Sequence, residues 1–155
     1  MDRHEHEPKA LDPLAAQALA ERVAAEMFAR DLASQRMGMQ IVRCSPGRAE
    51  LSMIVREDMV NGHAICHGGF IFTLADSAFA FACNSYNLNT VAQGGSIEFV
   101  APARQGERLT AIAEERSLAG RTGVYDITVR NDRGETIALF RGKSYRIKGH
   151  VVDVP

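Results

Sequence analysis

The sequence predicts one α+β domain in which an antiparallel sheet surrounds a long apolar helix. A chain of 155 residues lies within the size range of a single ordinary domain. Apolar and polar residues alternate in several stretches, as half-buried strands require. Turn-forming residues separate most of these stretches, which favours antiparallel neighbours. One segment between them is apolar almost all round and predicts a helix that is buried on several sides.

A first helix is predicted close to the N-terminus, after a polar stretch that contains histidines. Asp12 and Pro13 have the residue types of an N-cap and a first helical position. The apolar residues that then recur at helical spacing are Leu19, Val23, Met27, Phe28 and Leu32. The helix is expected to end near Ser34. We therefore assign residues 1–36 to a tail and an amphipathic helix.

The period of the pattern changes to that of strands from Met39 onward. After a turn at residues 45–47, the apolar residues Ala49, Leu51, Met53 and Val55 alternate with Arg48, Glu50 and Ser52. Further strands are predicted over residues 91–101, 107–115, 123–130 and 135–147. Within one of these strands, Tyr125, Ile127 and Val129 share a face.

The segment from His67 to Tyr86 predicts the central helix. It is rich in Phe, Leu, Ile and Ala and has almost no polar face. In an antiparallel α+β chain, a helix of this kind has to be enclosed by a curling sheet, and that arrangement is the hot-dog fold. We expect the hot-dog domain to occupy residues 37–150 and a short tail to follow at 151–155.

Composition excludes several classes of function. Charged residues make up 24% of the chain and the formal net charge is -1, so no positive field for nucleic acid is expected. The three cysteines lack CxxC spacing, which favours reduced thiols over a disulfide framework. The N-terminus lacks the apolar segment of a secretory signal, and no charge-free apolar stretch is long enough to span a membrane. We therefore expect a cytoplasmic protein that binds neither membrane nor nucleic acid.

Asp76 is the unexpected polar residue of the central helix. Thr73, Asp76 and Ser77 stand at positions i, i+3 and i+4 and form one narrow stripe. Burial of an ionised carboxylate without partners is costly, so Asp76 is held by hydrogen bonds, protonated, or open to a wet cleft. If hydrogen bonds hold Asp76, its role is structural, at an interface. If Asp76 is open to a wet cleft, a function is predicted.

The start of the same helix predicts an anion-binding site at His67, Gly68 and Gly69. The first N–H groups of a helix point outward at the positive end of its dipole. Glycine lacks a Cβ atom, so a ligand could approach the backbone closely. The paired glycines also fit a packing role at a strand-to-helix junction, and both interpretations stay open at this point.

The separation of Gly68 and Asp76 has a consequence for assembly. Eight residues along one helix correspond to about 12 Å, so one substrate carbonyl could not touch both groups. Catalytic groups and oxyanion donors have to converge within about 3 Å of the reacting atoms. Asp76 of one subunit is therefore expected to face Gly68 of another, and the active site requires at least a dimer.

Other candidates for chemistry near the helix are His63, Cys66 and His67. Their H-x2-C-H spacing could hold zinc, but a structural zinc site needs four ligands and no second Cys or His cluster is available in the ordered part of the chain. Cys66 and His67 also have the residue types of a nucleophile and a base, although such pairs are usually assembled from distant segments. We therefore expect no metal and treat Cys66 as a packing residue.

Residues 61–85 read NGHAICHGGFIFTLADSAFAFACNS. This segment resembles the phenylacetate-degradation thioesterases of the hot-dog superfamily. The resemblance extends through residues 97–102, through GRTGVYD at 120–126 and through ALFRGKS at 138–144, so that it covers roughly residues 37 to 148.

This resemblance implies an enzyme that hydrolyses acyl-CoA thioesters. The implied substrates are phenylacetyl-CoA and its ring-hydroxylated relatives, and the implied assembly is a homotetramer built as a dimer of hot-dog dimers. By position, the family's catalytic carboxylate corresponds to Asp76 and its oxyanion amide to Gly68. The polar residues beside the thioester carbonyl correspond to Asn61 and His67. No metal or redox cofactor is implied, since coenzyme A is part of the substrate.

The resemblance also leads us to expect contacts to the CoA phosphates. Candidates are the basic residues Arg121, Arg141 and Lys143, which suit phosphate by charge but on strands are usually solvated. Gly120 and Thr122 would shape the turn beside Arg121. Some relatives have a serine on the strand after the helix to hold the water, whereas this chain has glycines in that region, at 94 and 95.

Two rival functions remain at this stage. One is a hot-dog hydratase or dehydratase acting on acyl-CoA, with proton transfer by a histidine and a carboxylate. The other is a non-catalytic acyl-CoA-binding protein in which Asp76 only satisfies a neighbouring serine. Hydrolysis of the thioester bond and its loss on substitution of Asp76 would separate these from a thioesterase.

Overall fold

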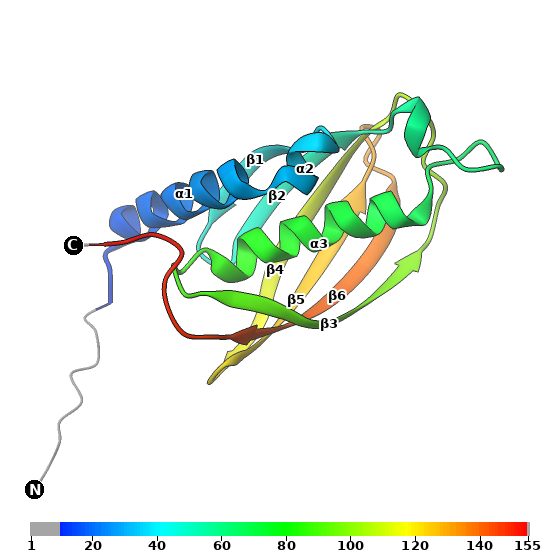
Figure 1. Cartoon of the computed structure of the whole chain (residues 1–155). Helices are drawn as coiled ribbons and strands as arrows, with labels where there is room; N and C mark the ends of the chain where they lie inside the picture. The colour runs from blue at the N-terminus through cyan, green and yellow to red at the C-terminus, as the bar shows by residue number, and fades with distance from the viewer. Residues whose placement is uncertain (1–9, 155) are drawn as a thin grey trace, which may run out of the picture.

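The computed structural model describes residues 10–154 and shows a six-stranded sheet curved around one long helix (Figure 1). The elements are α1 (Pro13–Arg30), α2 (Leu32–Arg36), β1 (Gln40–Ser45), β2 (Arg48–Ile54), η1 (Glu57–Met59), α3 (Gly68–Asn84), β3 (Thr90–Phe99), β4 (Arg108–Ala119), β5 (Thr122–Arg130) and β6 (Thr136–Arg146). The strands lie in the order β1-β2-β4-β5-β6-β3, and all neighbours are antiparallel. This is the predicted hot-dog fold. Residues 1–9, where most of the expected N-terminal tail falls, and residue 155 lie outside the described residues.

The N-terminal segment forms two helices, and the prediction of one helix to near Ser34 is wrong at Asp31. The start is as expected, because the Asp12 side chain accepts hydrogen bonds from the amides of residues 14 and 15. Asp31 leaves the helical region at φ -88° and ψ 81°, and its carboxylate accepts a hydrogen bond from the Ser34 N–H at 3.0 Å. Asp31 therefore ends α1 and caps α2. A hydrogen bond from a backbone N–H to an Asp side chain competes with the backbone hydrogen bonds that would continue a helix.

The predicted strands and turns are confirmed, with small shifts of their ends. Gly47, Gly120 and Gly134 have φ angles of 72°, 59° and 78° in the turns before β2, β5 and β6, where the missing Cβ atom makes a positive φ acceptable. β4 continues four residues beyond its predicted end, through a register shift between Glu115 and Ser117. The sequence pattern fades there because the strand passes beyond the helix and is exposed on both sides.

Helix α3 lies in the concave side of the sheet and supplies much of the core (Figure 1). Its fully buried residues include Leu74, Ala75 and Ala78, and the small alanines let strands approach closely. The predicted inner face of β5 is confirmed, since Tyr125, Ile127 and Val129 are all buried. The Phe79 ring packs against Gly142 of β6. A Cβ atom at position 142 would lie only 2.8 Å from that ring.

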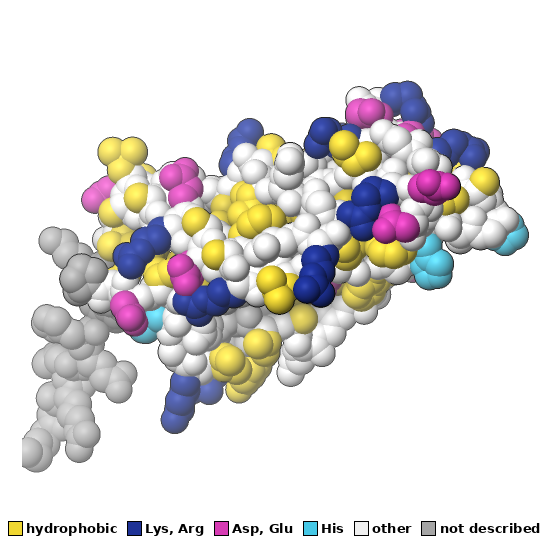
Figure 2. Space-filling view, turned by 45° about the horizontal axis from the view of Figure 1, so that its top comes forward, with side chains coloured by type: hydrophobic (Ala, Val, Ile, Leu, Met, Phe, Trp, Pro, Cys, Tyr) yellow, Lys and Arg dark blue, Asp and Glu magenta, His cyan; other side chains and the backbone are white. Residues whose placement is uncertain are grey.

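Strand β3 is one edge of the sheet, paired with β6 on its other side. Eight of its ten residues are exposed, including Val91 and Phe99. On the face shown in Figure 2, Lys and Arg side chains are interspersed with Asp and Glu side chains, in line with the small net charge. None of the described helices is long and apolar enough to cross a membrane.

Candidate active site at the start of helix α3

A short closed loop leads into α3 and fixes where the helix begins. An isolated bridge joins Val60 to Cys66, and the Asn61 N–H donates to the Ile65 carbonyl at 2.8 Å. The following amides are also held, since Cys66 N–H donates to the residue 103 carbonyl at 2.7 Å and His67 N–H to the residue 59 carbonyl at 2.8 Å. These bonds hold the first turn of α3 against the end of the sheet.

Asn61 organises this loop with its side-chain oxygen and keeps its side-chain N–H groups free of described partners. Its Oδ1 accepts hydrogen bonds from the N–H of His63 at 2.9 Å and, at 3.4 Å, from that of Ile65. The oxygen is thereby distinguished from the amide nitrogen, which points its donors elsewhere. Asn61 also borders a cavity beside the helix start. Its amide is thus a donor available to a bound ligand.

His67 caps α3 and leaves one backbone donor open. Its Nδ1 accepts a hydrogen bond from the Gly69 N–H at 3.0 Å, and its carbonyl accepts one from the Phe70 N–H at 3.0 Å. The Gly68 N–H has no hydrogen-bond partner among residues 10–154. Because Nδ1 is an acceptor, the proton of a neutral His67 ring is on Nε2, which makes Nε2 a second donor near the helix start.

Both glycines of the helix start lie in close contact with side chains of the same chain. A Cβ atom at Gly68 would lie 2.8 Å from the tip of the Phe99 ring, and one at Gly69 would lie 3.2 Å from the His67 Nδ1. The expectation that the glycines make room for a ligand is therefore incomplete, because Phe99 and the capping imidazole occupy that space. Phe99 was missed by the sequence analysis, since the strand order that brings β3 beside α3 leaves no local pattern.

Gly68 and Asn61, which carry two of the three open donors, border a cavity of about 460 Å³, whereas His67 is not part of its wall. The rest of the lining is almost wholly apolar: Ile65, Cys66, Ile71, Phe99, Val100, Ala101, Pro102 and Ala103. Hydrogen-bond donors in an apolar, partly enclosed site act more strongly on a developing negative charge than they would in water. The arrangement is therefore suited to polarising a carbonyl group.

Asp76 lies half-buried in the middle of α3 and has no hydrogen bond or ion pair with the described part of the chain. Its expected neighbours are occupied elsewhere: the Thr73 hydroxyl donates to the Gly69 carbonyl at 2.8 Å, and the Ser77 hydroxyl lies 2.9 Å from that of Ser34. Partial burial raises the pKa of the Asp76 carboxyl above its ordinary value. Of the alternatives open from the sequence, fixation by intrachain hydrogen bonds finds no support.

A single chain does not bring Asp76 and Gly68 together. Asp76 is two helical turns beyond Gly68, about 12 Å along the axis, and it is not part of the cavity wall that contains Gly68. Asp76 instead belongs, with Phe72, to the residues of α3 that are not fully buried. Of the large apolar side chains in and near α3, those of Phe79, Phe81 and Met59 fill the core and that of Phe70 is partly buried, whereas that of Phe72 is exposed.

The candidate phosphate contacts lie in two places, neither of which borders the Gly68 cavity. Gly120, Arg121 and Thr122 form the β4–β5 turn, where the Thr122 hydroxyl donates to the residue 119 carbonyl at 3.1 Å. Arg141 and Lys143 lie on the outer face of β6. They are exposed, whereas the alternating residues Gly142 and Ser144 are buried on the inner face.

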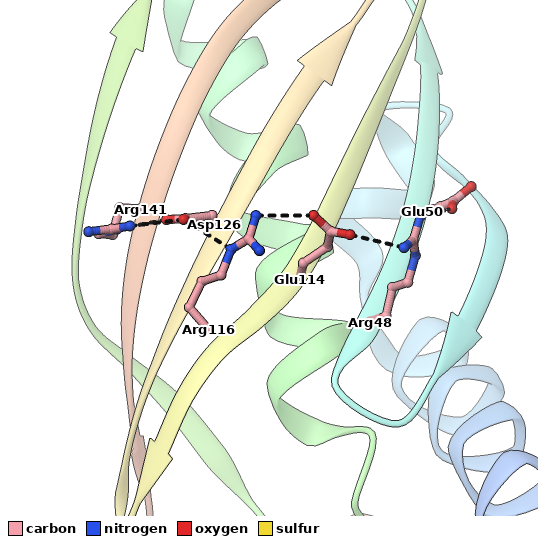
Figure 3. A network of polar contacts seen from close by, with 6 residues as sticks. All are labelled: Arg48, Glu50, Glu114, Arg116, Asp126 and Arg141. Atoms are coloured by element: carbon pink, nitrogen blue, oxygen red, sulfur yellow. Dashed lines mark hydrogen bonds and ion pairs between the residues drawn. The ribbon is translucent and has the colours of Figure 1, made fainter.

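Arg141 is held in an ionic network across the outer face of the sheet (Figure 3). Its Nε and Nη2 donate to the two carboxylate oxygens of Asp126 at 2.6 and 2.8 Å, which lowers the pKa of that carboxyl. Asp126 also accepts from Arg116, and the network continues through Glu114 to Arg48. Lys143 is exposed on the same face of β6 and lies outside this network.

The three cysteines are free thiols within the described structure, and none has the environment of a nucleophile. Burial raises the pKa of Cys66 to about 11 and that of Cys83 to about 12, so both are protonated near neutral pH. The residues described form no group of three or more Cys, His, Asp or Glu that could hold a metal ion. Cys66 lies in the cavity wall as an apolar group, as the packing interpretation expects.

The chain is similar to known thioesterases in sequence. Residues 63–138 match the family described as the thioesterase superfamily. The acyl-coenzyme A thioesterase PaaI of Escherichia coli strain K12 is 46% identical over 125 residues, which is 81% of this chain and 89% of that protein.

Solved structures agree with this likeness. The E. coli PaaI protein from the phenylacetic acid degradation operon has a TM-score of 0.86 at 44% identity, covering 87% of this chain and 98% of its own. A mutant of the phenylacetic acid degradation protein PaaI from Thermus thermophilus has a TM-score of 0.71 at 35% identity, covering 74% and 97%. A hypothetical thioesterase protein from Streptococcus pneumoniae TIGR4, solved with coenzyme A, has a TM-score of 0.70 at 21% identity, covering 72% of this chain and 88% of its own, and supports the fold alone.

Proposed function

The chain belongs to the PaaI-type acyl-CoA thioesterases of the thioesterase superfamily, and we propose that it hydrolyses phenylacetyl-CoA or hydroxyphenylacetyl-CoA with Asp76 as the reacting carboxylate. It is a hydrolase of thioester bonds. One observation carries the proposal for the site: α3 carries, at its start, an amide and, two turns later, a carboxylate, and neither group has a partner among residues 10–154. The preference for an arylacetyl group rests on the likeness to PaaI proteins and on the apolar wall beside Gly68.

In this proposal the thioester carbonyl binds at the helix start. The Gly68 N–H donates to the carbonyl oxygen, and the Asn61 side-chain amide and His67 Nε2–H assist it. As the carbonyl carbon becomes tetrahedral, its oxygen gains negative charge and these donors stabilise it more than they stabilise the substrate. The positive end of the α3 dipole acts in the same direction.

Asp76 then acts by one of two routes that give the same products. As a general base, it takes a proton from water while the water oxygen attacks the carbonyl carbon, and the carbon–sulfur bond breaks to release CoA. As a nucleophile, its oxygen displaces CoA and forms a mixed anhydride, which water then hydrolyses to the free acid. Both routes need the ionised carboxylate. Neither needs a metal or a redox cofactor, and none is part of the proposal.

The site is completed in the proposal by a second copy of the chain. Since Gly68 and Asp76 of one chain are too far apart to share a carbonyl, Asp76 of the partner subunit faces Gly68. The open edge of β3 and the exposed side of α3 beside it supply a surface through which two copies could join. A tetramer made of two such dimers follows the expectation from the resemblance, and free cysteines fit a cytoplasmic location.

Coenzyme A phosphates are proposed to meet basic side chains beyond this cavity. Arg121 is on an exposed turn and Lys143 is exposed on β6, whereas Arg141 is already paired with Asp126. Gly120 and Thr122 keep the Arg121 turn in shape. Among the three cations, Arg121 and Lys143 therefore have the stronger claim on a phosphate.

The direct test compares release of free thiol from phenylacetyl-CoA by the wild type, by Asp76→Ala and by Asp132→Asn as a matched exposed-carboxylate control. Asp76→Ala is expected to lose at least about a hundredfold in kcat, because positioned acid–base or nucleophilic groups contribute on that scale. Asp132→Asn should match the wild type, since that side chain is in the exposed β5–β6 turn. An active Asp76→Ala enzyme would remove Asp76 from the reaction. A wild type that binds but does not cleave the thioester would favour the non-catalytic or hydratase alternatives.

A further inference from the structure

Phe72 is an aromatic side chain whose exposure the single chain does not explain. Its ring packs edge-on against Phe140, with centroids 5.2 Å apart and planes at 79°, and Phe140 in turn packs on Phe79 at 6.1 Å. Gly95 makes room for Phe140, because a Cβ atom there would lie 2.6 Å from that ring. One side of Phe72 is thus fixed by the core, while 37% of the residue remains exposed.

Phe72 lies on a side of α3 that the described residues leave uncovered. Between Ile71 and Asn84, the residues of α3 that are not buried are Phe72, Thr73, Asp76 and Ala80. These positions recur at helical spacing and form a continuous strip. Because helical side chains lean toward the N-terminus, the Asp76 carboxylate leans toward the turn that carries Phe72. Phe72 is therefore the large apolar group of the strip and a neighbour of the reacting carboxylate.

A two-fold axis through the proposed site has to pass close to Phe72. This step rests on the proposed function, in which Gly68 of each copy faces Asp76 of the other. In a two-fold interface the contacts are reciprocal, so the two α3 helices run antiparallel and cross the axis at the midpoint of the two paired positions. The midpoint between residues 68 and 76 is residue 72, and the two copies of Phe72 meet there.

The neighbouring edge strand independently allows the same axis. β3 runs beside α3 in the opposite direction, since Phe99 touches Gly68 while the Thr90 carbonyl accepts a hydrogen bond from Asn84 at 2.9 Å. The residue of β3 level with Phe72 is Ile97, which pairs with Phe140 under the Phe72 ring. Two β3 edges that pair antiparallel about Ile97 would therefore extend the sheet across the same two-fold axis that relates the two α3 helices.

We infer that Phe72 packs against Phe72 of the partner subunit on the two-fold axis and forms the shared wall between the two active sites. Each ring then covers the exposed apolar surface of the other, which removes the cost of leaving it in water. One face of the paired rings borders each site, between the amide of one copy and the carboxylate of the other. The pair thus fixes the spacing across which the substrate carbonyl is held.

Site-directed cross-linking tests this placement. Phe72→Cys is oxidised with diamide in the full-length protein and run on a non-reducing gel. Two thiols on a two-fold axis approach disulfide distance, so most of the variant should become covalent dimer. Ala80→Cys is the matched control on the same strip. It lies about 12 Å farther along each helix, and because the helices run in opposite directions the two copies are about 24 Å apart. Wild type is the second control, as its cysteines are buried.

The expected result is at least a tenfold higher yield of dimer from Phe72→Cys than from Ala80→Cys. A second variant, Thr73→Cys, keeps the test decisive if Phe72→Cys folds poorly. It should be joined by a short bismaleimide, while Ala80→Cys should not. Equal yields at 72 and 80, or a higher yield at 80, would overturn the inference.

The outcome is separable from that of the proposed function. If Asp76→Ala loses activity but cross-linking shows no preference for position 72, the role of Asp76 is supported and the position of Phe72 on the two-fold axis is rejected. If position 72 cross-links but Asp76→Ala stays active, the position of Phe72 on the axis is supported and the role of Asp76 in the reaction is rejected.

Discussion

The first turn and the middle of α3 differ in how many of their polar and apolar groups have partners within the same chain. In the first turn, His67 satisfies the Gly69 and Phe70 amides, Phe99 fills the space beside Gly68, and the Gly68 N–H has no partner among residues 10–154. In the middle, the Asp76 carboxylate has no partner among the described residues, and Phe72 keeps an exposed aromatic surface.

This difference separates preorganisation from assembly. An oxyanion donor is effective when its direction is fixed before the substrate arrives, and the capped helix start meets that condition within one chain. A carboxylate that must be ionised is costly to enclose, so leaving it on an open side keeps the single chain foldable. The two halves of one site are then brought together only when two chains meet.

The largest expected effect concerns the open amide of the first turn. Gly68→Pro removes this N–H, and proline is acceptable at the first helical position after His67, whose ψ of 132° is the conformation that precedes proline. Loss of one oxyanion donor should lower kcat by about 10²–10³-fold. Steady-state kinetics with phenylacetyl-CoA measures the effect.

Gly68→Ala is the matched control for that change. It adds a Cβ atom against the same Phe99 ring tip but keeps the N–H, and the exposed ring can move by rotating its flexible side chain. Its kcat should therefore stay within about tenfold of the wild type, well above that of Gly68→Pro. Equal losses in both variants would mean that crowding, and not the missing donor, causes the defect.

The pH dependence probes the middle of α3. Partial burial raises the pKa of Asp76 above 3.8, and both routes need its ionised form. As the pH falls through the raised pKa, protonation should reduce kcat/KM, approaching about tenfold per pH unit on the acid side. Rates over a pH series, with circular dichroism to confirm folding at each point, measure this limb. Constant activity down to pH 3.8 in folded protein would contradict a carboxylate that acts as an anion.

The smallest expected effect concerns the polar contact that holds the middle of α3 to its own chain. The Ser34 hydroxyl donates to Asp31 at 2.5 Å, so the buried Ser77 hydroxyl donates to Ser34 at 2.9 Å. Ser77→Ala should lower the free energy of unfolding by about 1 kcal/mol, and Ser34→Ala by about 1–3 kcal/mol because it leaves two groups unpaired. Urea unfolding measures both. Additive losses in the double variant would show that the two hydroxyls do not interact.

Much of the fold could be predicted because its signals are local. The apolar helix, the alternating strands and the glycine turns each follow from residues close in sequence. The break at Asp31 escaped prediction because the apolar spacing continues across it, and only the capping bond to Ser34 reveals it. The position of β3 beside β6 could not be predicted either, since it depends on how the whole sheet closes.

The site was predictable to the same extent. Gly68 and Asp76 stand out as a helix start and as a charge in an apolar segment, so the sequence alone identifies them as candidates. The free N–H of Gly68 and the direction of the His67 ring depend on hydrogen bonds that spacing does not specify. Phe99 reaches Gly68 through the sheet order, and Arg141 is engaged by Asp126 on a neighbouring strand.

Mixed dimers test the central claim, that two chains share each site, most directly. Asp76→Asn and Gly68→Pro chains with different affinity tags are co-expressed, and the dimers that carry both tags are isolated. Each mixed dimer contains one site with an intact amide and an intact carboxylate from opposite chains, and one site with neither. The mixed dimers should recover about half the wild-type kcat, although both parents are nearly inactive. Mixed dimers as inactive as both parents would contradict it.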